Sequence, residues 1–185
     1  MKNLAILASG SGTNAEEIIK YFQTSSKGRV VLVASNKKEA FVLQRAKKFQ
    51  VPSYIFNKAS LESGELAQKL NEHKVDLVVL AGFLLKIPES LIQAFPDRIV
   101  NIHPALLPKF GGKGMYGAKV HEAVKEAGDQ ETGITIHLVN QNYDEGKIIF
   151  QAAVSINPED SPETIGQKVH QLEHKYFPNV IESLL

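Results

Sequence analysis

The chain has 185 residues, of which 43% are hydrophobic and 22% charged, and this ordinary composition excludes a disordered or fibrous protein. Its 21 Lys and Arg residues balance 20 Asp and Glu residues, and the resulting net charge of +1 excludes the basic surface of a general nucleic-acid binder. The lack of cysteine excludes disulfides, a thiolate nucleophile and a zinc–cysteine site.

Short runs of branched apolar residues alternate with segments of helical spacing in the first hundred residues. Because these runs lack polar alternation, they favour parallel strands that are covered on both faces. We therefore predict a doubly wound, Rossmann-like α/β sheet with helices on both faces. The predicted strands are Leu4–Ala8, Val30–Ala34, Ser53–Phe56, Leu77–Ala81 and Ile99–Ile102. The predicted helices are Thr13–Phe22, Lys38–Phe49 and Ser60–His73.

The pattern changes in the last third of the chain. Two strand-like runs, Thr132–Asn140 and Lys147–Ile156, are too close for a crossover helix, which predicts a late antiparallel strand in the mostly parallel sheet. A final helix is predicted over Ser161–Leu184, with Ser161 as its N-cap. Pro178 is expected to end or kink that helix. No linker divides the sequence, so we predict one domain over residues 1–185.

The apolar runs of this chain are short. The longest, such as Asp76–Phe83, fall far below the roughly 20 residues that a membrane-spanning helix needs. The run after Met1 is too short for the core and cleavage region of a signal peptide. We expect a soluble, cytoplasmic protein with neither a membrane nor a nucleic-acid partner.

The first predicted strand runs into a glycine-rich turn, Ser9-Gly-Ser-Gly-Thr-Asn14, and then into a helix. Backbone N–H groups at such a turn can bind an anion, and ligands of these sheets lie at the carboxyl ends of the strands. The turn completes neither a dinucleotide fingerprint nor a nucleoside triphosphate loop. Its hydroxyl and amide groups suit one phosphate monoester, and a tight turn with a helix cap is the structural alternative.

Two further polar groups follow later strands. Asn101 and His103 share one face at the end of a strand, where an amide and an imidazole can both reach one carbonyl oxygen. Asp144, in Tyr143-Asp-Glu-Gly146, can pair with His103, raise the pKa of its imidazole and orient the ring, or hold a water that moves protons. A solvated loop and a turn aspartate remain the alternatives.

The segment His170-Gln-Leu-Glu-His174 matches an inverted zinc-peptidase pattern. Such a site needs a third protein ligand, and the eleven residues after His174 hold no histidine and only one acidic side chain, Glu182. We therefore predict no metal site. His137 lies within a predicted strand, which favours a hydrogen-bonded core or supporting role.

In chain order, four motifs resemble the phosphoribosylglycinamide formyltransferase family, and the similarity extends over essentially the whole chain. The motifs are Ser9–Asn14, Val79–Phe83, Asn101–Pro108 and Tyr143–Gly146. The resemblance implies a single formyltransferase domain that acts as a monomer or homodimer. It also implies direct formyl transfer from 10-formyltetrahydrofolate to the amine of glycinamide ribonucleotide, in de novo purine biosynthesis and without a metal.

The resemblance also implies roles for individual residues. The implied catalytic group is Asn101, His103 and Asp144. The implied ribonucleotide-binding residues are Gly12, Thr13, Asn14 and Glu173. The implied folate-binding residues are Leu84, Leu85, Ile87, Asn101, Asn140 and Asp144. In this division, residues 1 to about 100 bind the ribonucleotide phosphate, and residues from about 101 to 185 are catalytic and folate-binding.

The implied chemistry is direct attack of the amine on the formyl carbon. Asn101 and a protonated His103 would stabilise the tetrahedral oxyanion. Asp144 would favour the charged imidazole and pass the proton, through water, from the amine to the departing folate nitrogen.

The sequence departs from the family pattern at two places. Leu84-Leu85, followed by Lys86, replaces a frequent methionine-arginine pair. Glu62-Ser-Gly-Glu65 lacks the arginine that helps many members to hold the ribonucleotide, and nearby Lys58 is given no role. The competing hypotheses are another 10-formyltetrahydrofolate-dependent formyltransferase or hydrolase on the same core, and a non-catalytic nucleotide-binding module.

Overall fold

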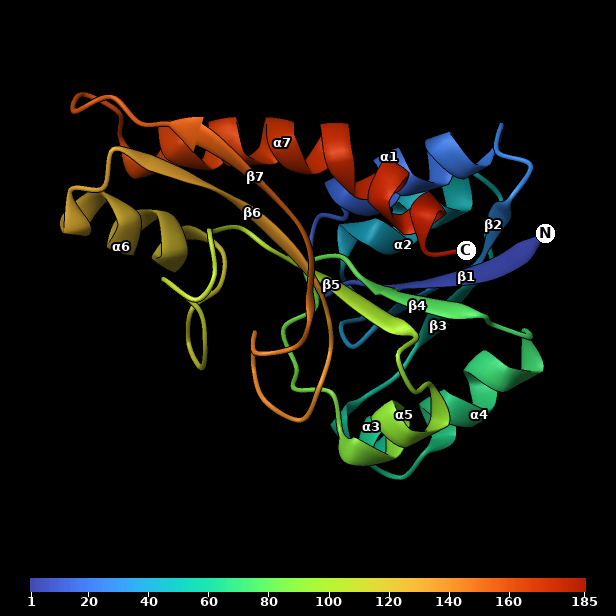
Figure 1. Ribbon diagram of the computed structural model, residues 1–185. Coiled ribbons are helices and arrows are strands. Elements are labelled where there is room, and N and C mark those ends of the chain that lie inside the picture. Colours follow the sequence, from blue (N-terminus) through green and yellow to red (C-terminus); the bar gives the residue numbers. More distant parts are fainter.

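Seven strands form one sheet in the order β3-β2-β1-β4-β5-β6-β7 in the computed structural model, which describes residues 1–185 (Figure 1). Strands β1 to β5 are parallel, whereas β6 is antiparallel to both of its neighbours. The predicted mostly parallel sheet with one late antiparallel strand is therefore confirmed. The strands are β1 (Lys2–Leu7), β2 (Gly28–Ser35), β3 (Ser53–Ile55), β4 (Leu77–Leu80), β5 (Ile99–His103), β6 (Glu131–Leu138) and β7 (Ile148–Ser155).

Helices cover both faces of the sheet, as predicted. Helices α1, α2, α6 and α7 contribute to one apolar core, and α3, α4 and α5 contribute to the other, below the sheet in Figure 1. The helices are α1 (Thr13–Phe22), α2 (Phe41–Lys48), α3 (Lys58–Glu62), α4 (Glu65–Glu72), α5 (Glu89–Ala94), α6 (Ala118–Ala127) and α7 (Pro162–Ser183).

Strand β1 illustrates why these apolar runs form central strands. Leu4 and Ile6 belong to one core, Ala5 and Leu7 belong to the other, and all four side chains are fully buried. Successive side chains of a strand point to opposite faces, so a run without polar residues is stable only between two layers of helices.

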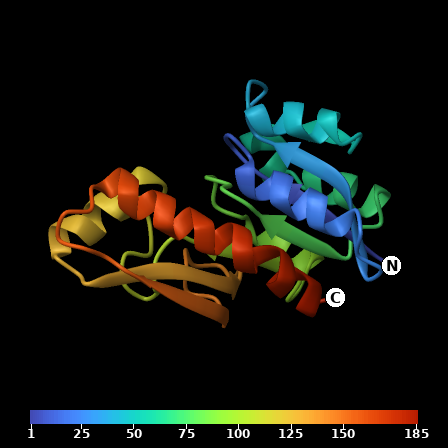
Figure 2. The same cartoon turned by 90° about the horizontal axis from the view of Figure 1, so that it is seen from above.

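Helix α7 links distant parts of the chain. It extends from the region of α6 and β7 across to α1 (Figure 2). The side chain of Ser161 accepts a hydrogen bond from the backbone N–H of Thr164 at 3.2 Å, which confirms the predicted N-cap. Pro178 does not end the helix, since Phe177 and Ile181 continue to pack into the buried core beside it.

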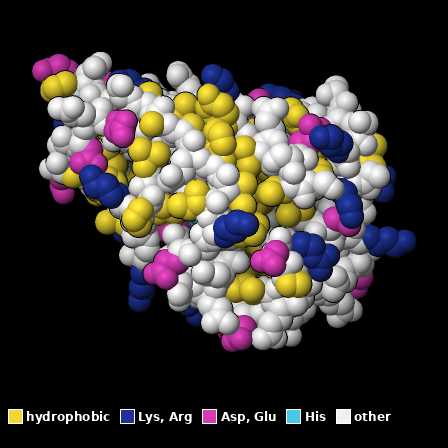
Figure 3. All heavy atoms as spheres, in the orientation of Figure 1, with side chains coloured by type: hydrophobic (Ala, Val, Ile, Leu, Met, Phe, Trp, Pro, Cys, Tyr) yellow, Lys and Arg dark blue, Asp and Glu magenta, His cyan; other side chains and the backbone are white.

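The predicted helix over Ser60–His73 is two helices, because Gly64 adopts a left-handed conformation (φ 88°) between α3 and α4. Helices α5 and α6 were not predicted. Charged side chains surround a band of hydrophobic ones on the face shown in Figure 3. None of the helices combines the length and apolar character that crossing a membrane requires.

Candidate active site

A cavity of about 750 Å³ lies at the carboxyl ends of β1, β4 and β5. The segments that follow these strands line it, and the β6–β7 loop and α7 complete its wall. Every residue that the sequence analysis placed in the site lines this one cavity. They are Gly12, Thr13, Asn14, Leu84, Leu85, Ile87, Asn101, His103, Asn140, Asp144 and Glu173.

The glycine-rich turn lies between β1 and α1, and its tightest point is Gly12. Gly12 has a φ of 73°, and a Cβ atom there would lie 2.4 Å from Cγ2 of Val42. Only glycine fits this position. Arg45 of α2 donates a hydrogen bond from Nε to the carbonyl oxygen of Ser11 at 2.8 Å, which fixes the turn from outside.

Ser9 connects the turn after β1 with the loop after β4, and both of these segments line the cavity. Its hydroxyl donates to Oδ1 of Asn36 at 2.6 Å and accepts the backbone N–H of Leu84 at 3.0 Å. The backbone N–H of Ser9 donates to the carbonyl oxygen of Gly82 at 3.0 Å. Sequence reasoning treated Ser9 only as part of the turn, and its contact with the loop after β4 appears only in three dimensions.

Asn101 and His137 are cross-strand neighbours on β5 and β6, and both line the cavity. The Asn101 amide donates from Nδ2 to Nε2 of His137 at 3.1 Å, while Nδ1 of His137 lies 2.9 Å from the carbonyl oxygen of Leu138. Both contacts are made when the His137 ring carries a proton on Nδ1. His137 therefore orients the Asn101 amide, which leaves the second amide hydrogen available to a ligand.

His103 is buried at the end of β5, and its two ring nitrogens have different neighbours. Nε2 donates to the carbonyl oxygen of Phe110 at 2.7 Å, and Nδ1 lies 3.5 Å from Oδ2 of Asp144. Burial lowers the pKa of His103 below its ordinary value, although the nearby Asp144 carboxylate opposes this change. Asp144 thus acts to raise this pKa, as predicted, but desolvation outweighs its charge, so the net shift disfavours the resting, protonated His103 that the resemblance implies.

Asp144 adopts a left-handed backbone conformation (φ 55°) in the β6–β7 loop, and this turns its carboxylate into the cavity. Its Oδ2 accepts the backbone N–H of Gly112 at 3.0 Å, and Oδ1 lies 3.6 Å from Nε2 of His137. Burial raises the pKa of Asp144, but His137, His103 and the Gly112 N–H together lower it below its ordinary value. The carboxylate is therefore ionised at neutral pH.

The apolar part of the cavity follows β4. Ile87 is buried in the sheet core, whereas the Leu84 side chain is 42% exposed, and Leu85 lies between these extremes. We call this apolar part of the cavity, between the loop after β4 and the β6–β7 loop, the slot. Nζ of Lys86 lies 5.7 Å from the centre of the Tyr143 ring, and this contact connects the two loops. An apolar slot with polar edges suits a flat aromatic ligand.

At the opposite end of the cavity, α7 meets the glycine-rich turn. The Asn14 amide donates from Nδ2 to Oε2 of Glu173 at 2.8 Å. The same carboxylate oxygen lies 2.7 Å from Nδ1 of His170, whose Nε2 lies 2.7 Å from Oγ1 of Thr13. Sequence reasoning named Glu173 for this site but considered His170, one turn away on α7, only as a zinc ligand.

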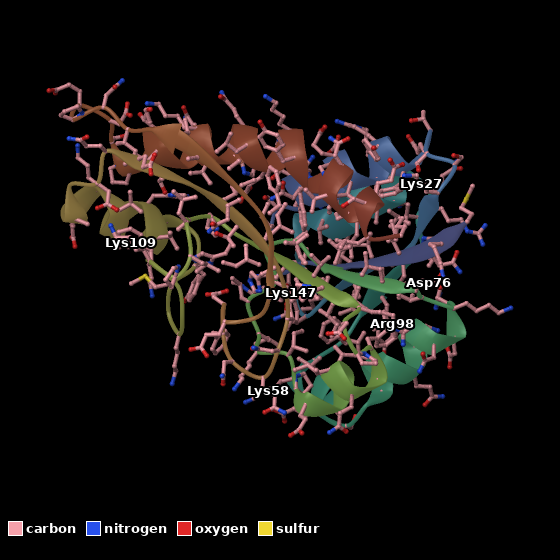
Figure 4. All side chains as sticks on the ribbon, in the orientation of Figure 1. Lys27, Lys58, Asp76, Arg98, Lys109 and Lys147 are labelled. Atoms are coloured by element: carbon pink, nitrogen blue, oxygen red, sulfur yellow. The ribbon has the colours of Figure 1, made fainter.

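His121 is a second cavity residue that sequence reasoning missed. It lies on α6 beside Gly166 of α7, and its Nδ1 is buried without a hydrogen-bond partner. Nothing in the sequence placed His121 in the site, because α6, the helix that carries it, was not predicted. Lys58, by contrast, pairs with Glu62 at 3.6 Å on α3, near the bottom of Figure 4, and does not line the cavity.

An amide, an ionised carboxylate and a buried imidazole around a cavity at the carboxyl edge of a doubly wound sheet are typical of an enzyme active site. The model of the formyl transferase family matches residues 2–181 of the chain, which therefore belongs to this family. This membership confirms the class that the four motifs predicted.

Within this family, the chain is similar to several phosphoribosylglycinamide formyltransferases. The chain is 40% identical over 192 residues to phosphoribosylglycinamide formyltransferase of Bacillus subtilis, with 100% of this chain and 95% of that protein covered. It is 44% identical over 190 residues to the chloroplastic phosphoribosylglycinamide formyltransferase of Arabidopsis thaliana, and this match covers 99% of the chain but only 65% of the plant protein. The chain thus spans less than two thirds of the plant relative.

Solved structures agree with this placement. The crystal structure of glycinamide ribonucleotide transformylase 1 from Geobacillus kaustophilus superimposes with a TM-score of 0.91 at 37% identity, covering 100% of this chain and 99% of that one. The crystal structure of phosphoribosylglycinamide formyltransferase from Bacillus halodurans superimposes with a TM-score of 0.90 at 39% identity, and the match covers 100% of this chain and 95% of that one.

Proposed function

We propose that this protein transfers the formyl group of 10-formyltetrahydrofolate to the amine of glycinamide ribonucleotide, a step of de novo purine biosynthesis. The observation that carries this proposal is the position of Asn101, His103 and Asp144 in one cavity that the glycine-rich turn and the apolar segment after β4 also line. In our assignment, Gly12, Thr13 and Asn14 take the ribonucleotide phosphate. The folate ring lies in the slot.

In this proposal the two parts of the chain keep the main roles that the sequence analysis gave them. Residues up to about 100 supply the phosphate turn, and residues from about 101 supply the catalytic group and the β6–β7 side of the folate slot. Glu173 of α7 adds a carboxylate at the ribonucleotide end, where its Oε2 is already held by Asn14.

The reaction forms one C–N bond and breaks another. The substrate amine attacks the formyl carbon, and the resulting oxyanion accepts the free amide hydrogen of Asn101. Collapse of this intermediate breaks the bond between the formyl carbon and folate N10. No side chain is acylated in this reaction. The proton that the amine loses ends on N10.

We assign the proton transfer to Asp144, because its carboxylate is ionised at neutral pH. Water carries the proton between the amine, this carboxylate and N10. His103 starts neutral, and the proton taken from the amine passes from Asp144 to Nδ1 of His103, 3.5 Å away, so that the ring is a cation while negative charge develops on the oxyanion. His103 returns this proton through Asp144 and water to N10 when the intermediate collapses. The imidazolium is thus formed during the reaction.

The direct test mixes the protein with glycinamide ribonucleotide and 10-formyltetrahydrofolate and follows the deformylated folate by absorbance. We expect folate release that depends on the ribonucleotide. Formate release without the ribonucleotide would instead identify a hydrolase, and binding without turnover would identify a non-catalytic module.

The Asn14→Ala variant tests the assignment of the two ends of the cavity. This substitution removes the Asn14 amide and its hydrogen bond to Glu173. It should raise the KM for the ribonucleotide by about tenfold, the effect of one hydrogen bond to a charged group, and leave the KM for the folate unchanged. Asn71→Ala, on the exposed face of α4, is the matched control. A change confined to the folate KM would contradict the assignment.

A further inference from the structure

His170 has a position that formyl transfer itself does not require. It lies on α7, away from Asn101 and His103, and its ring connects a carboxylate with a hydroxyl of the glycine-rich turn. Nδ1 lies 2.7 Å from Oε2 of Glu173, and Nε2 lies 2.7 Å from Oγ1 of Thr13. Both ring nitrogens are therefore engaged, and each contact has a short hydrogen-bond length.

The Glu173 contact fixes which nitrogen always carries a proton. An ionised carboxylate can only accept, so Nδ1 of His170 donates to Glu173 in both charge states of the ring. Only Nε2 changes. In the neutral ring Nε2 carries a lone pair and accepts a hydrogen bond, and in the imidazolium it carries a hydrogen and donates one.

This change reverses the hydrogen bond to Thr13. When the ring is neutral, the Thr13 hydroxyl must donate to Nε2 and has no hydrogen left for an anion. When the ring is protonated, Nε2 donates to Oγ1, and the Thr13 hydrogen is free to point into the cavity that Thr13 lines.

We propose that His170 is a positioning residue for the ribonucleotide phosphate, and that its protonation turns the Thr13 hydroxyl into a donor for a phosphate oxygen. This inference rests on the proposed function, because it takes the turn as the phosphate site. It adds a proton-linked gain in anion affinity that residues of the turn alone do not provide. No Lys or Arg side chain comes from the turn itself, so the protonated ring also supplies positive charge next to it.

The surrounding charges decide when His170 is protonated. The hydrogen bond to Glu173 raises the pKa of His170 above its ordinary value, even though burial acts against it. The other titratable and charged groups that face this cluster are His174 on α7, His121 on α6, His103 on β5, and Glu17 and Lys20 on α1. Because the folded pKa is raised, the protonated form is present at lower pH and is lost as the pH rises through that pKa.

The test measures sulfate affinity by calorimetry, since sulfate is a tetrahedral dianion whose own charge does not change near neutral pH. For the unaltered protein we expect the sulfate Kd to rise by about ten- to a hundredfold between about pH 6 and about pH 9, the effect of one charge-assisted hydrogen bond. A sulfate Kd that does not change with pH, or no sulfate binding at the lower pH, would overturn the inference.

Three variants assign the effect to its atoms. His170→Gln keeps a neutral donor and should remove the pH dependence, while Thr13→Val should give weak, pH-independent binding and Thr13→Ser should restore the dependence. His174→Gln is the matched control, because its ring lies 4.3 Å from that of His170 but has no bond to the turn, and it should keep the dependence. The same pH dependence in His170→Gln would contradict the assignment.

This experiment is separate from the test of catalysis. Sulfate binding needs neither folate nor formyl transfer, so its pH dependence can fail while turnover is normal, which overturns the role of His170 alone. If turnover fails while the pH-dependent binding and its loss in His170→Gln remain, the proposed reaction is wrong and the role of His170 in anion binding stands.

Discussion

At His103, burial and charge act in opposite directions, and burial has the larger effect on the pKa. A neutral imidazole next to an ionised carboxylate is a site that can accept a proton, whereas a resting imidazolium is not. The environment of Asp144 supports the same arrangement, since its pKa is lowered below an ordinary value that already lies far below neutral pH. The pair is thus prepared to receive charge during the reaction.

Two substitutions test this residue pair with its amide neighbour. Asn101→Ala removes the proposed oxyanion donor, and Asp144→Asn removes the proposed proton acceptor, so each should lower kcat by about a hundred- to a thousandfold. Circular dichroism should confirm an unchanged fold. Glu145→Gln, an exposed neighbour in the same loop, makes the same chemical change and should retain normal turnover. Near-normal rates in Asn101→Ala and Asp144→Asn would remove both residues from the mechanism.

Helices α1 and α2 are joined by a buried carboxylate. Glu16 of α1 pairs with Arg45 of α2, and its Oε1 lies 3.3 Å from Nζ of Lys20 and 3.4 Å from Nζ of Lys48. Burial acts to raise the pKa of Glu16, but hydrogen bonds from Arg45, Lys20 and Lys48 lower it to about 2. Since Arg45 also bonds to Ser11, this ion-pair cluster stabilises the glycine-rich turn.

Replacing Glu16 should therefore destabilise the fold in a pH-dependent way. Glu16→Gln should lower the free energy of unfolding by about 1–3 kcal/mol at neutral pH, measured by urea denaturation. The folded pKa is about 2 against an ordinary value of 4.5, so this stabilisation exists above pH 4.5 and is lost as the pH falls from 4.5 to 2. Glu17→Gln, half-buried on the same helix and paired with Lys20 at 2.8 Å, is the control. A pH-independent deficit in Glu16→Gln would contradict the ion-pair origin.

The elements differ in how well the sequence predicted them. The central strands and α1 were predictable because continuous apolar runs and strong helical spacing leave little choice. Helix α6 was not predictable, because only two of its side chains, Val120 and Val124, are buried and a glycine-rich loop precedes it. The same limit hid His121 and His170: helical spacing puts side chains on a face, but only tertiary packing decides what that face meets.

Across the whole molecule, the candidate ribonucleotide site joins residues from opposite ends of the chain. Thr13 and Asn14 belong to the start of α1, and His170 and Glu173 belong to α7. A ligand that binds both sides favours the folded state, in which they are together, over the unfolded chain.

Glycinamide ribonucleotide should consequently raise the thermal midpoint. At about 100 times its Kd it should add about 2.7 kcal/mol to the free energy of unfolding, measured by scanning calorimetry. The Asn14→Ala variant should need a higher ligand concentration for the same shift. An unchanged midpoint at saturating ligand would contradict binding to the folded protein.

The bond between Thr13 and His170 spans 157 residues, and this separation has a consequence for synthesis. A ribosome releases the glycine-rich turn before α7, and the turn must wait while the intervening residues are translated before its partners on α7 emerge. During that interval the nascent polypeptide can build β1 to β5 with their helices, yet it lacks a finished pocket. Competence to take a substrate therefore arrives only after α7 has been made.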